Sequence, residues 1–207
     1  MAGSSLTDLI KEIYLAGGFK IGEFKLTSGG LSPYYVDLRI LISRPRLFER
    51  LVDSYIDKIK SIGEDFDIIS GVETAGIPIA TLISYKTGLP MVYARSIERT
   101  HGTGRMVEGE LVEGSRVVIV DDVLTTGRSI ENAARTIRMA GGVVSYALVF
   151  LDRLQNGIKK LKEAGVTVYS VTDVKTFLKV LLENKLIRNS EYEKIIRYVE
   201  EFSNVEK

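Results

Sequence analysis

The stretch R-V-V-I-V-D-D-V-L-T-T-G-R-S-I, residues Arg116–Ile130, decides the fold of this chain. Its apolar run Val117–Val120 is rich in β-branched residues, which predicts a strand buried on both faces. Two adjacent carboxylates follow, and then a short turn of hydroxyl residues and glycine. Apolar residues at helical spacing come next and end at Gly141-Gly142, a typical helix stop. The stretch therefore predicts a strand of a parallel sheet that leads through a tight turn into a helix.

The turn after this strand has the chemistry of an anion site. Backbone N–H groups at the beginning of a helix point at one spot, and the helix dipole adds partial positive charge, which suits a phosphate. Thr125, Thr126 and Ser129 offer hydroxyl hydrogen bonds to the same anion. Asp121 and Asp122 would repel a phosphate, so we expect them to face sugar hydroxyls or a cationic group. The pattern predicts a ribose 5-phosphate site, although Asp122 and Thr126 would also suit plain helix caps.

The run Val117–Gly127 resembles the phosphoribosyl pyrophosphate (PRPP) binding signature of the type I phosphoribosyltransferases. The resemblance implies that Asp121 and Asp122 hold the ribose and that the turn holds the 5′-phosphate. It also implies Mg²⁺ as a cofactor, carried by the pyrophosphate of PRPP and not by a direct protein site. The signature identifies neither the base nor whether the protein is an enzyme.

The composition excludes several classes of site. The 207 residues include no cysteine and one histidine, His101, which excludes disulfides, cysteine nucleophiles and multi-histidine metal centres. A net charge of +1 gives no reason to expect nonspecific binding to nucleic acid or to an anionic membrane. No apolar run reaches the roughly 18 residues that span a bilayer, and no signal-peptide pattern is visible. We therefore expect a cytoplasmic protein.

The order of the expected elements predicts an α/β fold in a single domain, residues 1–207. A helix at 5–16 precedes two short strands at 24–26 and 32–38, which suggest a hairpin. Strands and helices then alternate as far as two C-terminal helices. This alternation predicts a parallel sheet flanked by helices.

Four further stretches resemble the orotate phosphoribosyltransferase family, and with the signature they cover the chain from about residue 19 to residue 157. The first, Phe24–Arg39, is similar to an N-terminal hairpin that forms part of the orotate pocket. The resemblance places about residues 1–40 in a hood over the base, with Tyr34 and Tyr35 matching an aromatic pair. A flat pyrimidine needs an aromatic face, but a strand with one tyrosine facing in and one facing out is the alternative.

Two more of these stretches follow later strands. Gly71–Ala80 is similar to the loop that holds the pyrophosphate, although a plain strand-to-helix turn fits the residues equally well. Phe150–Gly157 is similar to the segment that gives orotate an arginine, here Arg153. A guanidinium pairs with a carboxylate through two parallel hydrogen bonds, which a lysine cannot do. Read alone, this last fragment would be a surface turn.

The polar segment from Arg95 to Glu113 lacks helix and strand periodicity, so we expect a long functional loop. Its part up to Gly109 resembles the catalytic loop of the family, with Arg95, Arg99 and His101 at matching positions. Cations are needed where pyrophosphate departs, and a closing loop excludes the water that would hydrolyse PRPP. In the family this loop reaches the neighbouring subunit's site, so the resemblance implies a homodimer that shares the loop 95–109.

The chain departs from the family at positions that often carry lysine. Thr27, Ala75, Ser96 and Arg99 stand at these positions. Fewer lysines are therefore offered to the pyrophosphate, and we expect Arg95, Arg99 and Arg105 to supply the charge. We still expect an active enzyme.

The expected reaction is the attack of orotate N1 on the anomeric carbon of PRPP, giving orotidine 5′-monophosphate and pyrophosphate. The alternatives are a phosphoribosyltransferase for another base and a non-catalytic PRPP-sensing regulator of the same fold. We expect catalytic roles for Asp121, Asp122, Arg99 and His101, and orotate binding by Tyr34, Tyr35, Thr125 and Arg153. The residues expected to bind PRPP are Glu73, Thr74, Ala75, Arg95, Arg99, His101, Asp121, Asp122, Val123, Leu124, Thr125, Thr126, Gly127, Arg128 and Ser129.

Overall fold

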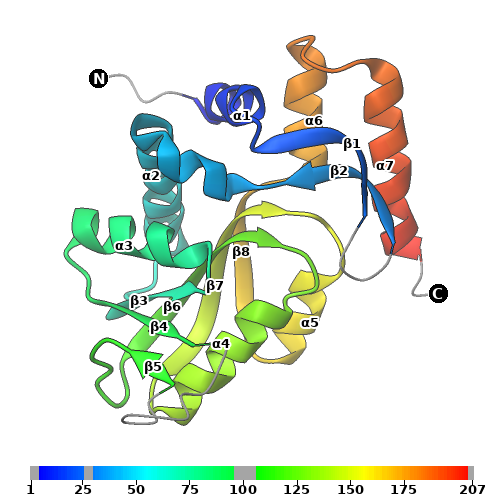
Figure 1. Ribbon diagram of the computed structural model, residues 1–207. Helices are drawn as coiled ribbons and strands as arrows, with labels where there is room; N and C mark the ends of the chain where they lie inside the picture. The colour runs from blue at the N-terminus through cyan, green and yellow to red at the C-terminus, as the bar shows by residue number, and fades with distance from the viewer. Residues whose placement is uncertain (1–4, 26–29, 96–105, 205–207) are drawn as a thin grey trace.

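The computed structural model describes residues 5–25, 30–95 and 106–204, with side chains described as far as Glu201. Helices surround a central sheet, and a separate hairpin lies at one end of it (Figure 1). The elements run in the order α1 (Leu6–Leu15), β1 (Phe19–Lys25), β2 (Leu31–Val36), the 3₁₀ helix η1 (Leu38–Ser43), α2 (Pro45–Ile62), β3 (Ile68–Val72), α3 (Gly76–Thr87), β4 (Met91–Ala94), β5 (Val107–Glu108), β6 (Arg116–Leu124), α4 (Arg128–Met139), β7 (Val143–Asp152), α5 (Gly157–Glu163), β8 (Thr167–Asp173), α6 (Val174–Glu183) and α7 (Asn189–Asn204).

The central sheet has the strand order β5-β4-β3-β6-β7-β8. Neighbouring strands are parallel except for β4 and β5, so the expected α/β fold with a parallel sheet flanked by helices is confirmed. Strand β6 lies inside the sheet between β3 and β7. This inner position explains the continuous apolar run of β6, because both of its faces are covered. Val118 and Val120 pack into the cluster formed with α2, α3 and α6. Val117 and Ile119 point the other way, into the cluster formed with α4 and α5.

The N-terminal hairpin begins earlier than expected. Strand β1 begins at Phe19, where we expected residue 24, and β2 ends at Val36 before η1. The pairing register shifts between Ile21 and Phe24, and this bulge interrupts the alternation on which a strand prediction depends. The missed half of β1 is therefore the half that lies before the bulge.

An aromatic stack joins the hairpin to the C-terminal helices. The ring of Phe19 stacks on Tyr34 with centroids 5.2 Å apart and on Phe177 of α6 at 4.9 Å. The ring of Tyr198 on α7 meets Tyr34 edge-on at 6.1 Å. We expected a hood made of about residues 1–40 only. In the structure, α6 and α7 also lie against the hairpin (Figure 1). No helix within the described residues has both the length and the apolar character needed to cross a membrane.

Candidate active site

Three of the segments singled out in the sequence meet at one edge of the sheet. Strands β3, β6 and β7 are parallel neighbours, so their carboxyl ends lie at the same edge. The turn Glu73–Ala75 follows β3, the turn Thr125–Gly127 follows β6, and Arg153 follows β7. Residues that lie up to 80 positions apart in the chain are thereby brought to one place.

The acidic pair lies at the end of β6, where Asp121 is buried and Asp122 is partly buried. Asp121 is 8% exposed, and its Oδ1 accepts a hydrogen bond from the backbone N–H of Asp122 at 2.9 Å. Oδ1 of Asp122 accepts from the N–H of Val123 at 2.8 Å. Burial raises the pKa of both carboxyl groups, and the neighbouring Asp122 raises the pKa of Asp121 further. The pair therefore favours partners that donate hydrogen bonds or carry positive charge, such as the hydroxyls of a ribose that becomes cationic.

The turn after β6 leaves the beginning of α4 open to a ligand. Gly127 precedes the helix with a φ of 81°, a left-handed conformation that glycine adopts without strain. Among the described residues, no side chain caps α4 by a hydrogen bond. The alternative that Asp122 and Thr126 merely cap this helix is therefore wrong. The first N–H groups of α4 are left to bind an anion, with the hydroxyls of Thr125, Thr126 and Ser129 nearby in sequence.

Close backbone packing holds this turn from behind. A Cβ atom on Gly157 would lie 2.5 Å from the carbonyl oxygen of Thr125, so α5 begins directly against the turn. Gly76 meets β6 in the same way, because a Cβ there would collide with the carbonyl oxygen of Val120. Both contacts require glycine, and both fix the loops of neighbouring strands relative to β6.

The expected pyrophosphate loop borders a small hollow. Thr74 is exposed, Glu73 and Ala75 are partly buried, and the Glu73–Thr74 peptide bond is cis. A hollow of about 220 Å³ is lined by Glu73 together with Arg95 and Ser129. The structure thus brings one residue of the pyrophosphate loop, the first residue of the expected catalytic loop and the beginning of α4 to the same hollow.

The two ends of the expected catalytic loop are held together by β4 and β5. The N–H of Arg95 donates to the carbonyl of Met106 at 2.9 Å, and Nη1 of Arg95 lies 3.2 Å from Oε1 of Glu108. Strand β5 lies within the segment expected to be a loop, and it pairs antiparallel with β4 directly beside this hydrogen bond. The predicted loop residues Arg99 and His101 lie outside the described residues, as do Ser96, Arg105 and Thr27.

Arg153 is buried, so the alternative of a surface turn is wrong. Its side chain is directed to the hairpin, where Nε donates to the hydroxyl oxygen of Tyr34 at 3.0 Å and Nη2 donates to Oγ of Ser32 at 3.3 Å. Its guanidinium carbon lies 4.6 Å from the centre of the Tyr34 ring. The backbone N–H of Arg153 also donates to the carbonyl of Leu124 at 3.0 Å, which ties it to the end of β6.

The two tyrosines of the hairpin differ in exposure. Tyr34 is 0% exposed and packs in the core, whereas Tyr35 is partly exposed. The ring of Tyr35 lies 5.5 Å from that of Phe24, and its hydroxyl oxygen accepts a hydrogen bond of 3.4 Å from Arg39. The strand therefore has one tyrosine facing in and one facing out. This is the arrangement that we gave as the alternative to an aromatic pair at the base. Tyr35 is the member with surface left for a ligand.

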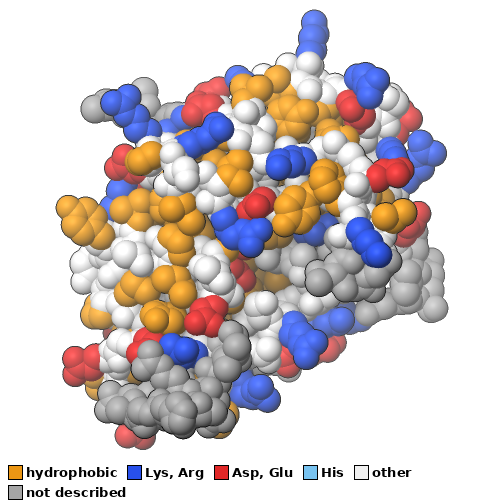
Figure 2. Space-filling model, viewed as in Figure 1, with side chains coloured by type: hydrophobic (Ala, Val, Ile, Leu, Met, Phe, Trp, Pro, Cys, Tyr) orange, Lys and Arg blue, Asp and Glu red, His pale blue; other side chains and the backbone are white. Residues whose placement is uncertain are grey.

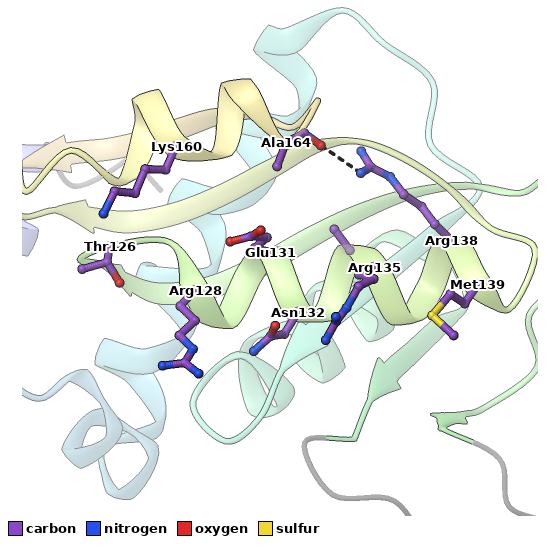
Figure 3. Close-up of a pocket in the computed structure, with 10 residues that line it drawn as sticks. Thr126, Arg128, Glu131, Asn132, Arg135, Arg138, Met139, Lys160 and Ala164 are labelled. Carbon is purple, nitrogen blue, oxygen red and sulfur yellow. Dashed lines mark hydrogen bonds between the residues drawn. The ribbon is translucent and has the colours of Figure 1, made fainter.

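A groove of about 890 Å³ runs along α4, on the outer side of the turn Thr125–Gly127, which we call the phosphate turn after its expected ligand (Figure 3). Thr126 and Arg128 line one end of it, and Lys160 of α5 lines it from the opposite side and points toward the turn. Sequence reasoning missed Lys160. It lies three residues beyond the stretch Phe150–Gly157, in the last turn of the short helix α5, where no motif marked it.

Comparisons with known proteins agree with this geometry. The family model described as "Phosphoribosyl transferase domain" matches residues 42–181. The chain therefore belongs to the phosphoribosyltransferase family, which the arrangement of strand, acid pair and phosphate turn had indicated.

Within that family the chain belongs to the orotate phosphoribosyltransferases, as its relatives show. The orotate phosphoribosyltransferase of Staphylothermus marinus is 41% identical over 196 residues, which cover 95% of each chain. The crystal structure of orotate phosphoribosyltransferase from Aeropyrum pernix matches with a TM-score of 0.74 and 32% identity, covering 84% of this chain and 98% of that one. The structure of Leishmania donovani UMP synthase matches with a TM-score of 0.86 and 27% identity over 96% of this chain. The present chain spans 43% of that longer protein.

Proposed function

We propose that this chain transfers the 5-phosphoribosyl group of PRPP to N1 of orotate, which yields orotidine 5′-monophosphate and pyrophosphate for pyrimidine biosynthesis. The observation that carries the proposal is a buried arginine, Arg153, at the same sheet edge as an acid pair and an open helix beginning. A phosphate, a ribose and a carboxylate-bearing base need these three features side by side. The relatives named above support the choice of orotate.

The PRPP side of the site uses the end of β6. The turn Thr125–Ser129 holds the 5′-phosphate through backbone N–H groups, hydroxyls and the positive end of α4. Asp121 and Asp122 accept hydrogen bonds from the ribose hydroxyls. As the bond to pyrophosphate breaks, the ribose ring becomes oxocarbenium-like, and the two carboxylates, one buried and one partly buried, stabilise this charge. No protein nucleophile is needed, because orotate N1 attacks the anomeric carbon directly.

The base side of the site uses Arg153, Thr125 and Tyr35. The guanidinium of Arg153 pairs with the orotate carboxylate, and Thr125 donates a hydrogen bond to the edge of the base. Tyr35 keeps exposed surface beside the hairpin, so we assign the aromatic contact to it. Tyr34, which we expected to bind orotate as well, has no exposed surface and therefore makes no direct contact with the base in this proposal.

The pyrophosphate side uses the turn Glu73–Ala75, Arg95 and the loop that follows it. Arg99 and His101 of this loop are proposed to close over the pyrophosphate, with His101 handling a proton near neutral pH. Mg²⁺, bound through the pyrophosphate oxygens, would supply charge neutralisation there. In the described part of the chain, no three histidine, cysteine, aspartate or glutamate side chains form a metal site.

We propose that the protein acts in the cytoplasm as a homodimer that shares the loop 95–109. Figure 2 shows hydrophobic side chains gathered over α3, where Tyr85 is 85% exposed. Nearby on η1, Ile42 is 47% exposed. An apolar face of this kind beside the strands that carry the loop is suited to a second subunit. The net charge of +1 supports neither nucleic acid nor an anionic membrane as a partner.

The proposal is tested by following loss of the orotate absorbance with PRPP and Mg²⁺ present. Turnover that requires all three components is expected, and chelation of the metal should stop it. Chelation should leave the melting temperature unchanged when PRPP is absent, because the metal arrives with the substrate. Turnover with uracil or a purine and not with orotate would favour a transferase for another base. Binding of PRPP without any turnover would favour a regulator.

A further inference from the structure

We propose that Tyr34 and Ser32 are positioning residues that give the base site its preference for a carboxylate, acting through Arg153. This inference rests on the function proposed above and goes beyond it. It assigns a role to two residues that touch neither substrate and that lie on a different element from Arg153.

The hairpin occupies one side of the guanidinium and leaves the other side for a ligand. Nε of Arg153 donates to the hydroxyl of Tyr34 at 3.0 Å, and one N–H of Nη2 donates to Ser32 at 3.3 Å. Among the described residues, no recorded hydrogen bond uses Nη1. A guanidinium has five N–H groups, so the edge formed by Nη1 and the second N–H of Nη2 remains available. That edge is one of the two that form paired hydrogen bonds with a carboxylate.

Tyr34 and Ser32 are themselves held firmly. The Tyr34 ring is stacked almost parallel on Phe19, with an interplanar angle of 6°, and is 0% exposed. Oγ of Ser32 donates to the backbone carbonyl of Tyr34 at 2.7 Å, and Ser32 is 1% exposed. Burial raises the pKa of Tyr34, so its hydroxyl stays neutral at physiological pH. Two neutral oxygen atoms therefore fix the direction of the arginine and leave its charge intact.

The charge of Arg153 calls for an anionic ligand. Its side chain is 7% exposed, and no ion pair involves it among the residues that the structure describes. A buried charge without an opposite charge is costly, and a substrate carboxylate would remove that cost. A neutral pyrimidine that lacks the carboxylate would leave the cost in place. Neutral partners on the hairpin thus favour the charged base, whereas an acidic partner would compete with it.

The test replaces Tyr34 by phenylalanine, which keeps the ring stack and removes only the hydroxyl. We expect Tyr34→Phe to raise KM for orotate about tenfold, as loss of one hydrogen bond to a charged group implies, with KM for PRPP unchanged. Ser32→Ala should act in the same direction. Tyr146→Phe is the matched control. Tyr146 lies on the first half of β7, and the change also removes a tyrosine hydroxyl that has a charged partner, Glu64.

The outcomes separate this inference from the proposed function. Wild-type turnover of orotate with unchanged kinetics in Tyr34→Phe would overturn the inference and leave the function standing. An equal rise of both KM values with a lower melting temperature would show a purely structural role and would also overturn it. Absence of wild-type turnover with orotate would remove the function and the inference together. A rise confined to KM for orotate, absent in Tyr146→Phe, supports it.

Discussion

The hydroxyl of Tyr55, in the middle of α2, donates a hydrogen bond of 2.7 Å to the backbone carbonyl of Asp121. The two residues are 66 positions apart, and Tyr55 is fully buried. The bond connects α2, which covers one face of the sheet, to Asp121, the first residue of β6 that belongs to the candidate site. The position of the acid pair therefore depends on core packing as well as on its own turn.

Replacing Tyr55 by phenylalanine should weaken both the fold and the site. The change keeps the ring in the core but removes the donor to the buried carbonyl of Asp121. We expect the free energy of unfolding to fall by about 1–3 kcal/mol, as for a buried group left without its partner, and kcat to fall with it. Urea unfolding and the orotate assay measure the two effects. A stable variant with full activity would show that the bond does not position the pair.

Asp121 should make the protein less stable at neutral pH than it could be. Burial and Asp122 raise its pKa in the folded state above its ordinary value of 3.8. Between these two values the folded state binds more protons than the unfolded state, so the free energy of unfolding falls as pH rises through this window. At pH values above the raised pKa, the whole loss of stability from the buried Asp121 carboxylate remains.

Asp121→Asn removes this titration and should separate stability from activity. We expect the variant to unfold at higher urea concentration than the wild type at pH 7, with the difference shrinking as pH falls toward 4. Turnover should be lost or strongly reduced, because the ribose loses a carboxylate partner. Urea unfolding curves across this pH range are the measurement. Equal stability of both proteins at every pH would contradict a raised pKa.

Much of the site could be predicted because it is local in sequence. The apolar run, the acid pair and the phosphate turn are contiguous, and parallel strands bring their ends together whatever the details of packing. The edge that carries Glu73, Asp121 and Arg153 follows from this rule alone. The role of β6 as an inner strand follows from its uniform apolar character.

The remaining features depend on contacts that no local pattern contains. Which hairpin tyrosine faces the core depends on the bulge between Ile21 and Phe24 and on helices more than a hundred residues away. The partners of Arg153 come from a strand about 120 residues earlier, and a period-2 pattern cannot give the distance between two elements. Strand β5 was missed because two paired residues are too short to show any periodicity.

Gly157→Ala should loosen the phosphate turn. The new Cβ would meet the carbonyl oxygen of Thr125 at 2.5 Å, and a backbone atom cannot move aside as a side-chain end can. We expect the free energy of unfolding to fall by about 1–3 kcal/mol, as for other overpacked sites, and KM for PRPP to rise. Gly30→Ala is the control, because its added Cβ would have no described atom within 4 Å other than those of its chain neighbours. Equal KM values for PRPP in the two variants would refute the contact's importance.

Lys160 should contribute to PRPP binding from outside the turn. It faces Thr126 across the groove beside α4, in a chain with few lysines at the expected pyrophosphate positions. We expect Lys160→Ala to raise KM for PRPP about threefold at low salt, and less at high salt because the interaction is screened. Lys162→Ala removes an exposed lysine from the same helix and should change nothing. An effect of equal size in both variants would indicate net charge alone.

Arg99→Ala should remove most of the catalysis without changing the fold. Arg99 belongs to the segment that leaves β4 at Arg95 and returns at Met106, where a backbone hydrogen bond of 2.9 Å joins the two ends. Loss of one charged group that stabilises a transition state typically costs about 100-fold or more in kcat. We therefore expect such a fall with an unchanged melting temperature, and partial recovery in Arg99→Lys. Arg46→Ala removes an exposed arginine at the beginning of α2 and is the control. An unchanged rate in Arg99→Ala would remove this loop from the mechanism and leave the charge on pyrophosphate to Arg95 and Mg²⁺.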